Sequence, residues 1–245
     1  MKKENRNKEN KQYNCDIISD IWDKNVYIRA LDIENNTDYS YTTIIKPFVV
    51  TESCRMSNKS SSILDIGCGC GYLTNAIYEN GRCFITAIDI SKKSIIYSSN
   101  KYPHIEFIHQ NIYSMPKTKF YDLALAVMTL NNLEDIEIFF SVLNDILKPK
   151  GILIIVLPHP CFWPSQHIKD ESFSYSEIRC YETEFSTKGR QDYPSKIHYY
   201  HRPLEVYLEN IRNYGFQIEY CKELVEKSIK NIPPDILGFV LKKIE

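Results

Sequence analysis

The stretch that decides the fold is Ile63-Leu64-Asp65-Ile66-Gly67-Cys68-Gly69-Cys70-Gly71-Tyr72-Leu73-Thr74, residues 63–74. Its first four residues form a short apolar run, which is typical of a buried strand. Three glycines follow at alternate positions, and helical spacing then continues up to Gly81. Glycine permits a sharp turn and lets a ligand approach the backbone, and the helix behind it offers unpaired N–H groups. The segment therefore predicts a strand, a turn and a helix, with a ligand site at the turn.

Strands and helices alternate along the chain beyond this unit. Apolar runs predict strands at residues 84–90, 105–108, 122–128 and 152–157. Helical spacing precedes the last of these strands, and residues 148–151 (KPKG) are predicted to end that helix. Two more strands are predicted at 216–220 and 236–241, after a helix that starts at Pro203. Such alternation favours a parallel sheet with helices on both faces. The predicted fold is α/β, a doubly wound, mostly parallel sheet of seven strands.

The segments outside this alternation predict a tail, a lid and a cap. Residues 1–12 are charged and rich in Asn, which predicts a disordered tail and not a signal peptide. Residues 13–51 carry helical spacing and are expected to form a helical lid, whereas the polar residues 52–62 are predicted to be a loop. Residues 158–202 are dense in aromatic side chains without a regular period, and we predict an inserted cap after the fifth strand. Residues 13–245 are accordingly expected to form a single domain.

Composition and charge argue against several classes of protein. The net charge is −1, so the basic excess that nucleic-acid binding requires is missing, and no nucleic-acid partner is expected. No run of about 18 apolar residues exists, so no membrane span is predicted. The eight cysteines contain no paired CxxC spacing, which argues against a metal site. Without a secretion signal, we expect reduced thiols in a cytoplasmic protein.

The glycine turn is compatible with two kinds of nucleotide ligand. A dinucleotide site requires G-x-G-x-x-G, but here Tyr72 stands at the third glycine position and Gly71 comes one residue early. A ligand without pyrophosphate needs only the turn. Asp89, at the end of the second predicted strand, can accept hydrogen bonds from ribose hydroxyls; alternatively it is a solvated residue before the helix that Ser91 caps. The pattern favours an adenosine-type ligand.

Three segments together resemble a known enzyme family. Residues 63–74, 87–91 (AIDIS) and 143–155 (LNDILKPKGILII) are similar to successive motifs of class I, Rossmann-like S-adenosylmethionine-dependent methyltransferases. Residues 158–162 and 201–204 resemble, more loosely, a branch of that family that acts on small molecules. The resemblance implies the class I fold, S-adenosylmethionine as cofactor, and direct methyl transfer to a small-molecule acceptor by O- or N-methylation.

The resemblance also implies which residues bind the cofactor. Asp65 and the backbone of the glycine turn would hold the methionine portion, and Asp89 would take the ribose hydroxyls. Many relatives carry Asp where Asn111 stands, so its contact with the adenine amine is expected to be weaker. The positions that match the family's cofactor site are Asp65, Gly67, Cys68, Gly69, Asp89, Ile90, Asn111, Ile112 and Val127.

Two histidines are candidates for a catalytic base, which adds to the rate only if the acceptor loses a proton. His159 directly follows the fifth strand and is expected above the cofactor crevice; alternatively it fixes the turn between two prolines. His201 lies where the insertion rejoins the fold and alternatively has a packing role. The aromatic insertion suits an apolar or cationic acceptor, unless its rings form a core of their own.

Other functions remain alternatives. A nicotinamide-dependent oxidoreductase is disfavoured by Tyr72. A nucleic-acid adenine methyltransferase is disfavoured because residues 128–132 (MTLNN) lack the Asn/Asp-Pro-Pro-aromatic motif of such enzymes. A peptide or protein methyltransferase, and an inactive methyltransferase-like binding subunit, also stay open.

Overall fold

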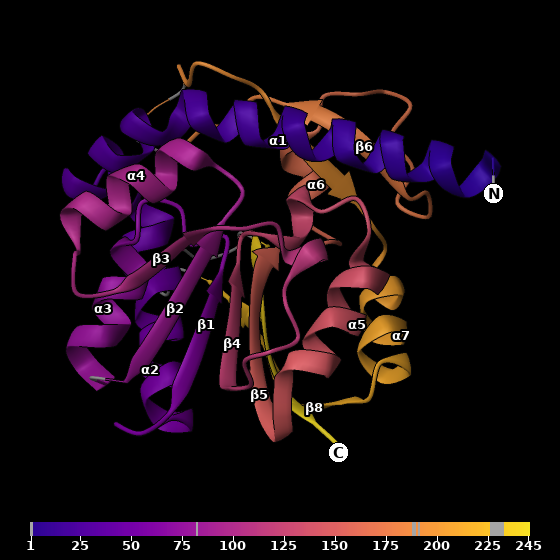
Figure 1. Ribbon diagram of the computed structural model, residues 1–245. Helices are drawn as coiled ribbons and strands as arrows, with labels where there is room; N and C mark the ends of the chain where they lie inside the picture. The colour runs from indigo at the N-terminus through magenta and orange to yellow at the C-terminus, as the bar shows by residue number, and fades with distance from the viewer. Residues whose placement is uncertain (1, 82, 188–189, 191, 226–232) are drawn as a thin grey trace.

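The central element of the fold is a seven-stranded sheet in the order β3-β2-β1-β4-β5-β9-β8 (Figure 1). The computed structural model describes residues 2–81, 83–187, 190, 192–225 and 233–245. Neighbouring strands from β3 to β5 are parallel, and β9 and β8 are antiparallel. The predicted α/β fold with a mostly parallel sheet of seven strands is confirmed. The strands are β1 Ser62–Ile66, β2 Phe84–Asp89, β3 Glu106–His109, β4 Tyr121–Val127, β5 Leu147–Pro158, β8 Phe216–Leu224 and β9 Ile236–Lys243.

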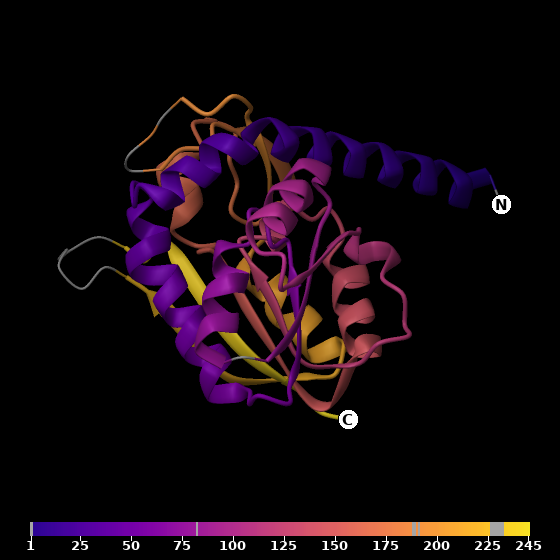
Figure 2. The same cartoon turned by 60° about the vertical axis from the view of Figure 1, so that its left-hand side comes forward.

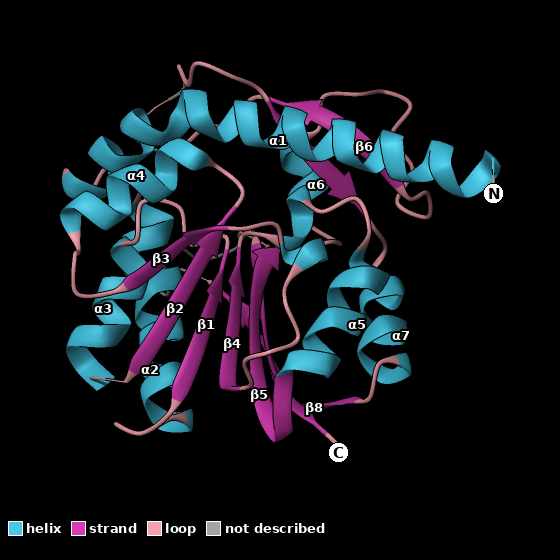
Figure 3. Ribbon diagram, viewed as in Figure 1, coloured by secondary structure: helices cyan, strands magenta, loops and turns pink. Residues whose placement is uncertain are grey.

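Helices cover both faces of this sheet, which explains why most residues of the central strands are apolar. Ile63 of β1 packs into the core beneath α2 and α3, whereas Leu64, the next residue, packs into the core beneath α5 and α7. Figure 3 shows the two helical layers on opposite sides of the strands. The helices of these layers are α2 Lys46–Met56, α3 Tyr72–Gly81, α4 Lys92–Lys101, α5 Ile136–Ile146 and α7 Leu204–Asn213.

The first helix, α1 Lys2–Glu34, crosses above the carboxyl ends of the parallel strands (Figure 1). Its backbone is helical from Lys2, and the disordered tail that composition predicts for residues 1–12 stays a prediction. The chain has no Gly or Pro before Pro47, and Lys, Glu and Gln favour helix. Figure 2 shows the N-terminal end of α1 extending beyond the rest of the molecule. The short helix η1 Tyr41–Ile45 then leads into α2.

Two local predictions are wrong. Residues 52–62 are not a loop throughout, because α2 continues to Met56 and β1 begins at Ser62. Residues 148–151 do not separate a helix from the fifth strand, because β5 already begins at Leu147. The register of β4 and β5 shifts between Tyr121 and Leu123, so this Pro- and Gly-containing segment forms an irregularity within the strand pair.

The segment predicted to be a cap contains regular structure of its own. It holds the short helix α6 Trp163–His167 and the antiparallel pair of strands β6 Arg179–Thr183 and β7 Ile197–His201. This pair lies next to α1, on the carboxyl-end side of the main sheet (Figure 1). Residues 188, 189 and 191 of the cap lie outside the described residues. The division into lid, single domain and cap stays a prediction.

The described part of the chain contains no helix that is long and apolar enough to cross a membrane. Within the same residues, no group of three His, Cys, Asp or Glu side chains is arranged to hold a metal ion. All eight cysteines are free thiols.

Candidate functional site

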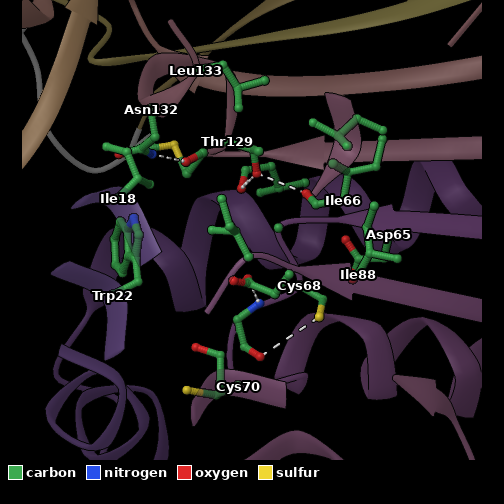
Figure 4. A pocket seen from close by; sticks show the side chains of 18 of the residues that line it. Ile18, Trp22, Asp65, Ile66, Cys68, Cys70, Ile88, Thr129, Asn132 and Leu133 are labelled. Carbon is green, nitrogen blue, oxygen red and sulfur yellow. Dashed lines mark hydrogen bonds between the residues drawn. The ribbon is translucent and has the colours of Figure 1, made fainter. Parts of the chain in front are cut away.

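A cavity of about 220 Å³ lies at the carboxyl ends of the parallel strands. Its walls come from α1, from the turns that follow β1 to β4, and from Tyr200 of β7. Ligands of open α/β sheets bind at this edge, outside the carboxyl ends of the strands. All nine residues that the sequence predicts to bind the cofactor line this cavity, although the role of each remains a prediction. Figure 4 shows side chains of its wall.

The turn after β1 is built by glycines in the left-handed region of backbone conformation. Gly67, Gly69 and Gly71 have φ angles of 74°, 53° and 76°. A Cβ at Gly67 would lie 2.4 Å from Thr129 Oγ1, and a Cβ at Gly71 would lie 2.8 Å from the Phe107 ring. A Cβ at Gly69 would meet nothing within 4 Å. Two of the glycines therefore permit close packing, whereas Gly69 leaves open space beside the turn.

Asp89 connects the tip of β2 to this glycine turn. Its two carboxylate oxygens accept hydrogen bonds from the backbone N–H of Gly69, at 2.8 Å, and of Ser91, at 2.7 Å. Burial raises the pKa of the carboxyl, and these two N–H groups act in the opposite direction. Each oxygen keeps a lone pair for a ligand. The carboxylate is thus held in a fixed orientation in the cavity wall.

Asp65, on β1, is a second buried carboxyl group in this wall. Its Oδ2 accepts a hydrogen bond of 2.6 Å from the Thr74 hydroxyl. Burial raises the pKa of Asp65 to about 6; the Thr74 hydrogen bond opposes the rise, and the nearby charge of Asp89 adds to it. The site therefore keeps two carboxyl groups close to the glycine turn, at a cost in folding stability.

We expect Asp65→Asn to be more stable than the unaltered protein at pH 7. A pKa raised from 3.8 to about 6 means that the folded state retains the proton more strongly, so stability is lost as the pH rises through 6. At pH 7 the free energy of unfolding of Asp65→Asn should exceed that of the unaltered protein by about 3 kcal/mol. This difference shrinks as the pH falls towards 4. Urea unfolding across this pH range measures it.

Asp122→Asn is the matched control for this experiment. Burial favours a raised pKa at Asp122, but hydrogen bonds from Lys148 and Ser62 prevail and lower it, so this substitution should reduce stability at pH 7. An Asp65→Asn variant that is less stable than the unaltered protein at every pH would contradict the assignment of a costly buried charge.

The turn after β3 forms the end of the cavity where the sequence predicts adenine contacts. Asn111 Oδ1 accepts a hydrogen bond from Tyr113 N, at 3.0 Å, and so caps the short helix η2 Ile112–Ser114. Its Nδ2 donates to Cys15 Sγ of α1, at 3.2 Å. The amide therefore fixes the local backbone and contacts α1, which leaves it one oxygen lone pair for a ligand.

Comparison with known proteins agrees with this geometry. A family model described as a methyltransferase domain matches residues 57–206. This chain belongs to the methyltransferase domain family. It is 26% identical over 183 residues to a ubiquinone biosynthesis O-methyltransferase of Rickettsia conorii, which covers 72% of this chain and 59% of that protein. It is 32% identical over 101 residues to a malonyl-[acyl-carrier protein] O-methyltransferase of Halalkalibacterium halodurans, which covers 38% of this chain and 37% of that protein.

Solved structures show the same fold. A putative S-adenosylmethionine-dependent methyltransferase from Listeria monocytogenes has a TM-score of 0.65 at 20% identity, covering 80% of this chain and 97% of that one. The chain spans less than two thirds of the length of the two curated relatives above. Together these comparisons establish the family and its fold.

Two residues of the cavity wall carry no signal in the sequence. Arg29 of α1 and Tyr41 of η1 line the cavity, far along the chain from the glycine motif. The Arg29 guanidinium pairs with Asp38 and lies 5.5 Å from the centre of the Tyr41 ring. The Tyr41 hydroxyl is buried and has no hydrogen-bond partner among the described residues. These donors come together only because α1 folds back over the sheet.

The structure does not bring His159 or His201 to the cavity wall. His159 is buried, with Nδ1 accepting a hydrogen bond of 3.2 Å from Cys161 N and Nε2 lying 3.4 Å from Glu223. His201 is fully buried in the cap, where its Nε2 bonds the Tyr175 carbonyl at 2.9 Å. This geometry favours the structural alternative for each ring over the role of a base.

We expect the melting temperature of the unaltered protein to fall relative to that of His201→Phe as the pH drops from 7.5 to 5.5. Burial lowers the pKa of His201 below 6.5, so the unfolded chain takes up a proton that the folded state resists, and stability is lost below pH 6.5. Phenylalanine keeps the ring contact with Phe173 and does not titrate. Turnover that disappears in His201→Phe while melting and cofactor affinity stay unchanged would instead indicate a catalytic base.

Proposed function

We propose that this methyltransferase moves the methyl group of S-adenosylmethionine to a small-molecule acceptor, by O- or N-methylation. The observation that supports this best is the roof of the cavity. Ile18, Trp22 and Val26 of α1 line it from above, and Tyr200 of the cap completes the wall. An acceptor has to fit beneath a helix to reach the strand tips, which favours a small molecule over a folded protein.

Contacts between α1 and the cap hold this roof in place. Asn25 is buried and exchanges two hydrogen bonds with the backbone of Ser195, at 3.2 and 3.1 Å. Asp32, also buried, accepts hydrogen bonds from Arg190 and Tyr193. These hydrogen bonds therefore connect α1 to the segment between β6 and β7 above the site.

The cavity residues fit the cofactor. Asp89 offers a fixed carboxylate for the ribose hydroxyls, and the open space beside Gly69 allows close approach to the backbone. Arg29 and the unpaired Tyr41 hydroxyl present donors that suit the carboxylate of the methionine portion. Ile90 and Ile112 supply apolar surface for the adenine ring.

S-adenosylmethionine, when bound, supplies an electrophilic methyl group for direct displacement by the acceptor. The chain's own contribution is to orient both molecules and to exclude water, which can account for most of the acceleration. The cavity wall, as far as the structure describes it, contains no histidine. Catalysis through position alone fits this wall better than a histidine base does.

The names of the curated relatives support a small acceptor, and one name indicates an acceptor group that is attached to a carrier protein. The Rickettsia protein is named for ubiquinone biosynthesis, and the Halalkalibacterium protein is named for a malonyl group on a carrier protein. A peptide or carrier-bound acceptor and an inactive binding subunit are the competing possibilities. The free thiols support a cytoplasmic location as part of the proposal.

The test is transfer of labelled methyl from S-adenosylmethionine in the presence of a cell extract, with the products separated by mass. Label in the low-mass fraction, absent with Asp89→Ala, supports the proposal. Label on protein or nucleic acid would overturn the small-molecule assignment. No label, despite cofactor binding measured by calorimetry, would favour the inactive subunit.

A further inference from the structure

Asn132 places an unpaired hydrogen-bond acceptor in the cavity wall. It ends the short helix η3 Leu130–Asn132, directly after β4. Its Nδ2 donates to the Met128 carbonyl at 3.0 Å, which fixes the orientation of the amide. Its Oδ1 is buried and has no hydrogen-bond partner among the described residues. Because a buried polar atom without a partner destabilises a protein, this oxygen requires a donor.

The adjacent Asn131 meets only one of two conditions for ligand binding, which are an unpaired amide oxygen and a position in the cavity wall. It is buried and its Oδ1 also lacks a partner in the described chain, but it does not line the cavity. Of the two amides, Asn132 alone can therefore meet a bound molecule. Asn131 supplies a matched control, with the same side chain, similar burial and a neighbouring position.

Three side-chain donors of the wall already have acceptors. The Thr129 hydroxyl donates to the Ile66 carbonyl at 2.9 Å. Asn14 Nδ2 donates to Glu134, and Asn111 Nδ2 donates to Cys15 Sγ. The donor for Asn132 Oδ1 is therefore expected to come from a molecule in the cavity.

The cofactor does not need this oxygen if it binds as proposed. Asp89 accepts from its ribose hydroxyls, and its adenine lies against the turn after β3. Asn132 belongs to a different part of the wall, where Figure 4 draws it on the same side as Ile18 and Trp22 of α1, with Leu133 above and Asp65 on the opposite side. Ile18, Trp22 and Leu133, which line the same cavity, are apolar residues.

We propose that this end of the cavity is the acceptor subsite, and that it takes a neutral aromatic compound whose hydroxyl or N–H group donates a hydrogen bond to Asn132 Oδ1. The inference rests on the proposed function and specifies its substrate class. An amide oxygen does not take up a proton near neutral pH, so Asn132 orients and selects the acceptor. A site that accepts a hydrogen bond discriminates strongly against an analogue without the donor.

The test uses phenol and toluene, two rings of similar size of which only phenol carries a donor. Each is titrated by NMR into protein saturated with S-adenosylhomocysteine, the demethylated product form of the cofactor. We expect phenol to bind about tenfold more tightly than toluene, as one buried hydrogen bond allows. Asn132→Leu should reverse this order, whereas Asn131→Leu should keep it.

The outcomes separate the inference from the proposed function. Equal affinities in the unaltered protein, tighter binding of toluene, or no binding of either ring would overturn the acceptor subsite. A loss of S-adenosylhomocysteine affinity in Asn132→Leu, measured by calorimetry, would also overturn it, because the oxygen would then serve the cofactor. Failure of the unaltered protein to bind S-adenosylhomocysteine would overturn the proposed function itself, and the subsite with it.

Discussion

Asp89→Ala is expected to weaken S-adenosylmethionine binding by about 100-fold, which corresponds to about 2.7 kcal/mol. The carboxylate is the fixed, charged acceptor at the tip of β2, and each hydrogen bond to a charged group contributes about 1.5–3 kcal/mol. The substitution also leaves the Gly69 N–H without its acceptor, which loosens the turn that faces the cofactor. The loss of the Gly69 hydrogen bond lowers folding stability, but removal of a buried carboxyl with a raised pKa partly offsets this effect. The variant should therefore remain folded.

Isothermal titration calorimetry measures this effect, with a thermal melt to confirm folding. Asp23→Ala is the matched control, because Asp23 accepts hydrogen bonds from Ser91 Oγ and Lys93 N close to the same turn but does not line the cavity. It should retain cofactor affinity. Unchanged affinity in a folded Asp89→Ala variant would contradict the assignment of this carboxylate to the ribose.

Gly67→Ala should lower the stability of the protein by about 3 kcal/mol, or about 10 °C in melting temperature for a chain of this size. Its φ of 74° is unfavourable for alanine, at about 1–2 kcal/mol. The added Cβ would also lie 2.4 Å from Thr129 Oγ1, which is held by the Ile66 carbonyl. Because the turn must move to relieve this clash, cofactor binding should be lost as well.

Two further variants separate backbone strain from the clash. Gly69→Ala meets nothing within 4 Å, so it should cost only the strain of its φ angle, about 1 kcal/mol. Thr129→Ala combined with Gly67→Ala removes the clashing hydroxyl, and the double variant should be more stable than the sum of the single losses predicts. Additive losses would show that Thr129 does not limit the space at Gly67.

Local sequence patterns were sufficient to predict most of the fold. The apolar runs of the strands are continuous because helices cover both faces of the sheet, so burial leaves a direct trace in the sequence. The predictions failed where pairing in the sheet overrode the local preference of the sequence. Residues 148–151 look like a break because they contain Pro and Gly, but the sheet accommodates them as an irregularity between β4 and β5.

The sequence by itself, through its resemblance to a known family, predicted nine residues of the cavity wall, because those residues lie at or near the ends of strands or in a glycine turn. Their position follows from the strand that precedes them, and the carboxyl ends of parallel strands meet at one edge. All nine predicted residues accordingly line the cavity.

Only the tertiary structure decided which side chains of the covering segments and turns reach the cavity. Arg29, Tyr41 and Asn132 reach the cavity through the packing of α1, η1 and η3, whereas His159 and His201 do not line its wall. Such contacts join segments far apart in the chain, so they depend on how helices pack across the sheet and leave no local periodicity. The physical reason is that spacing along the chain encodes which face of an element is buried, but not which distant element covers it.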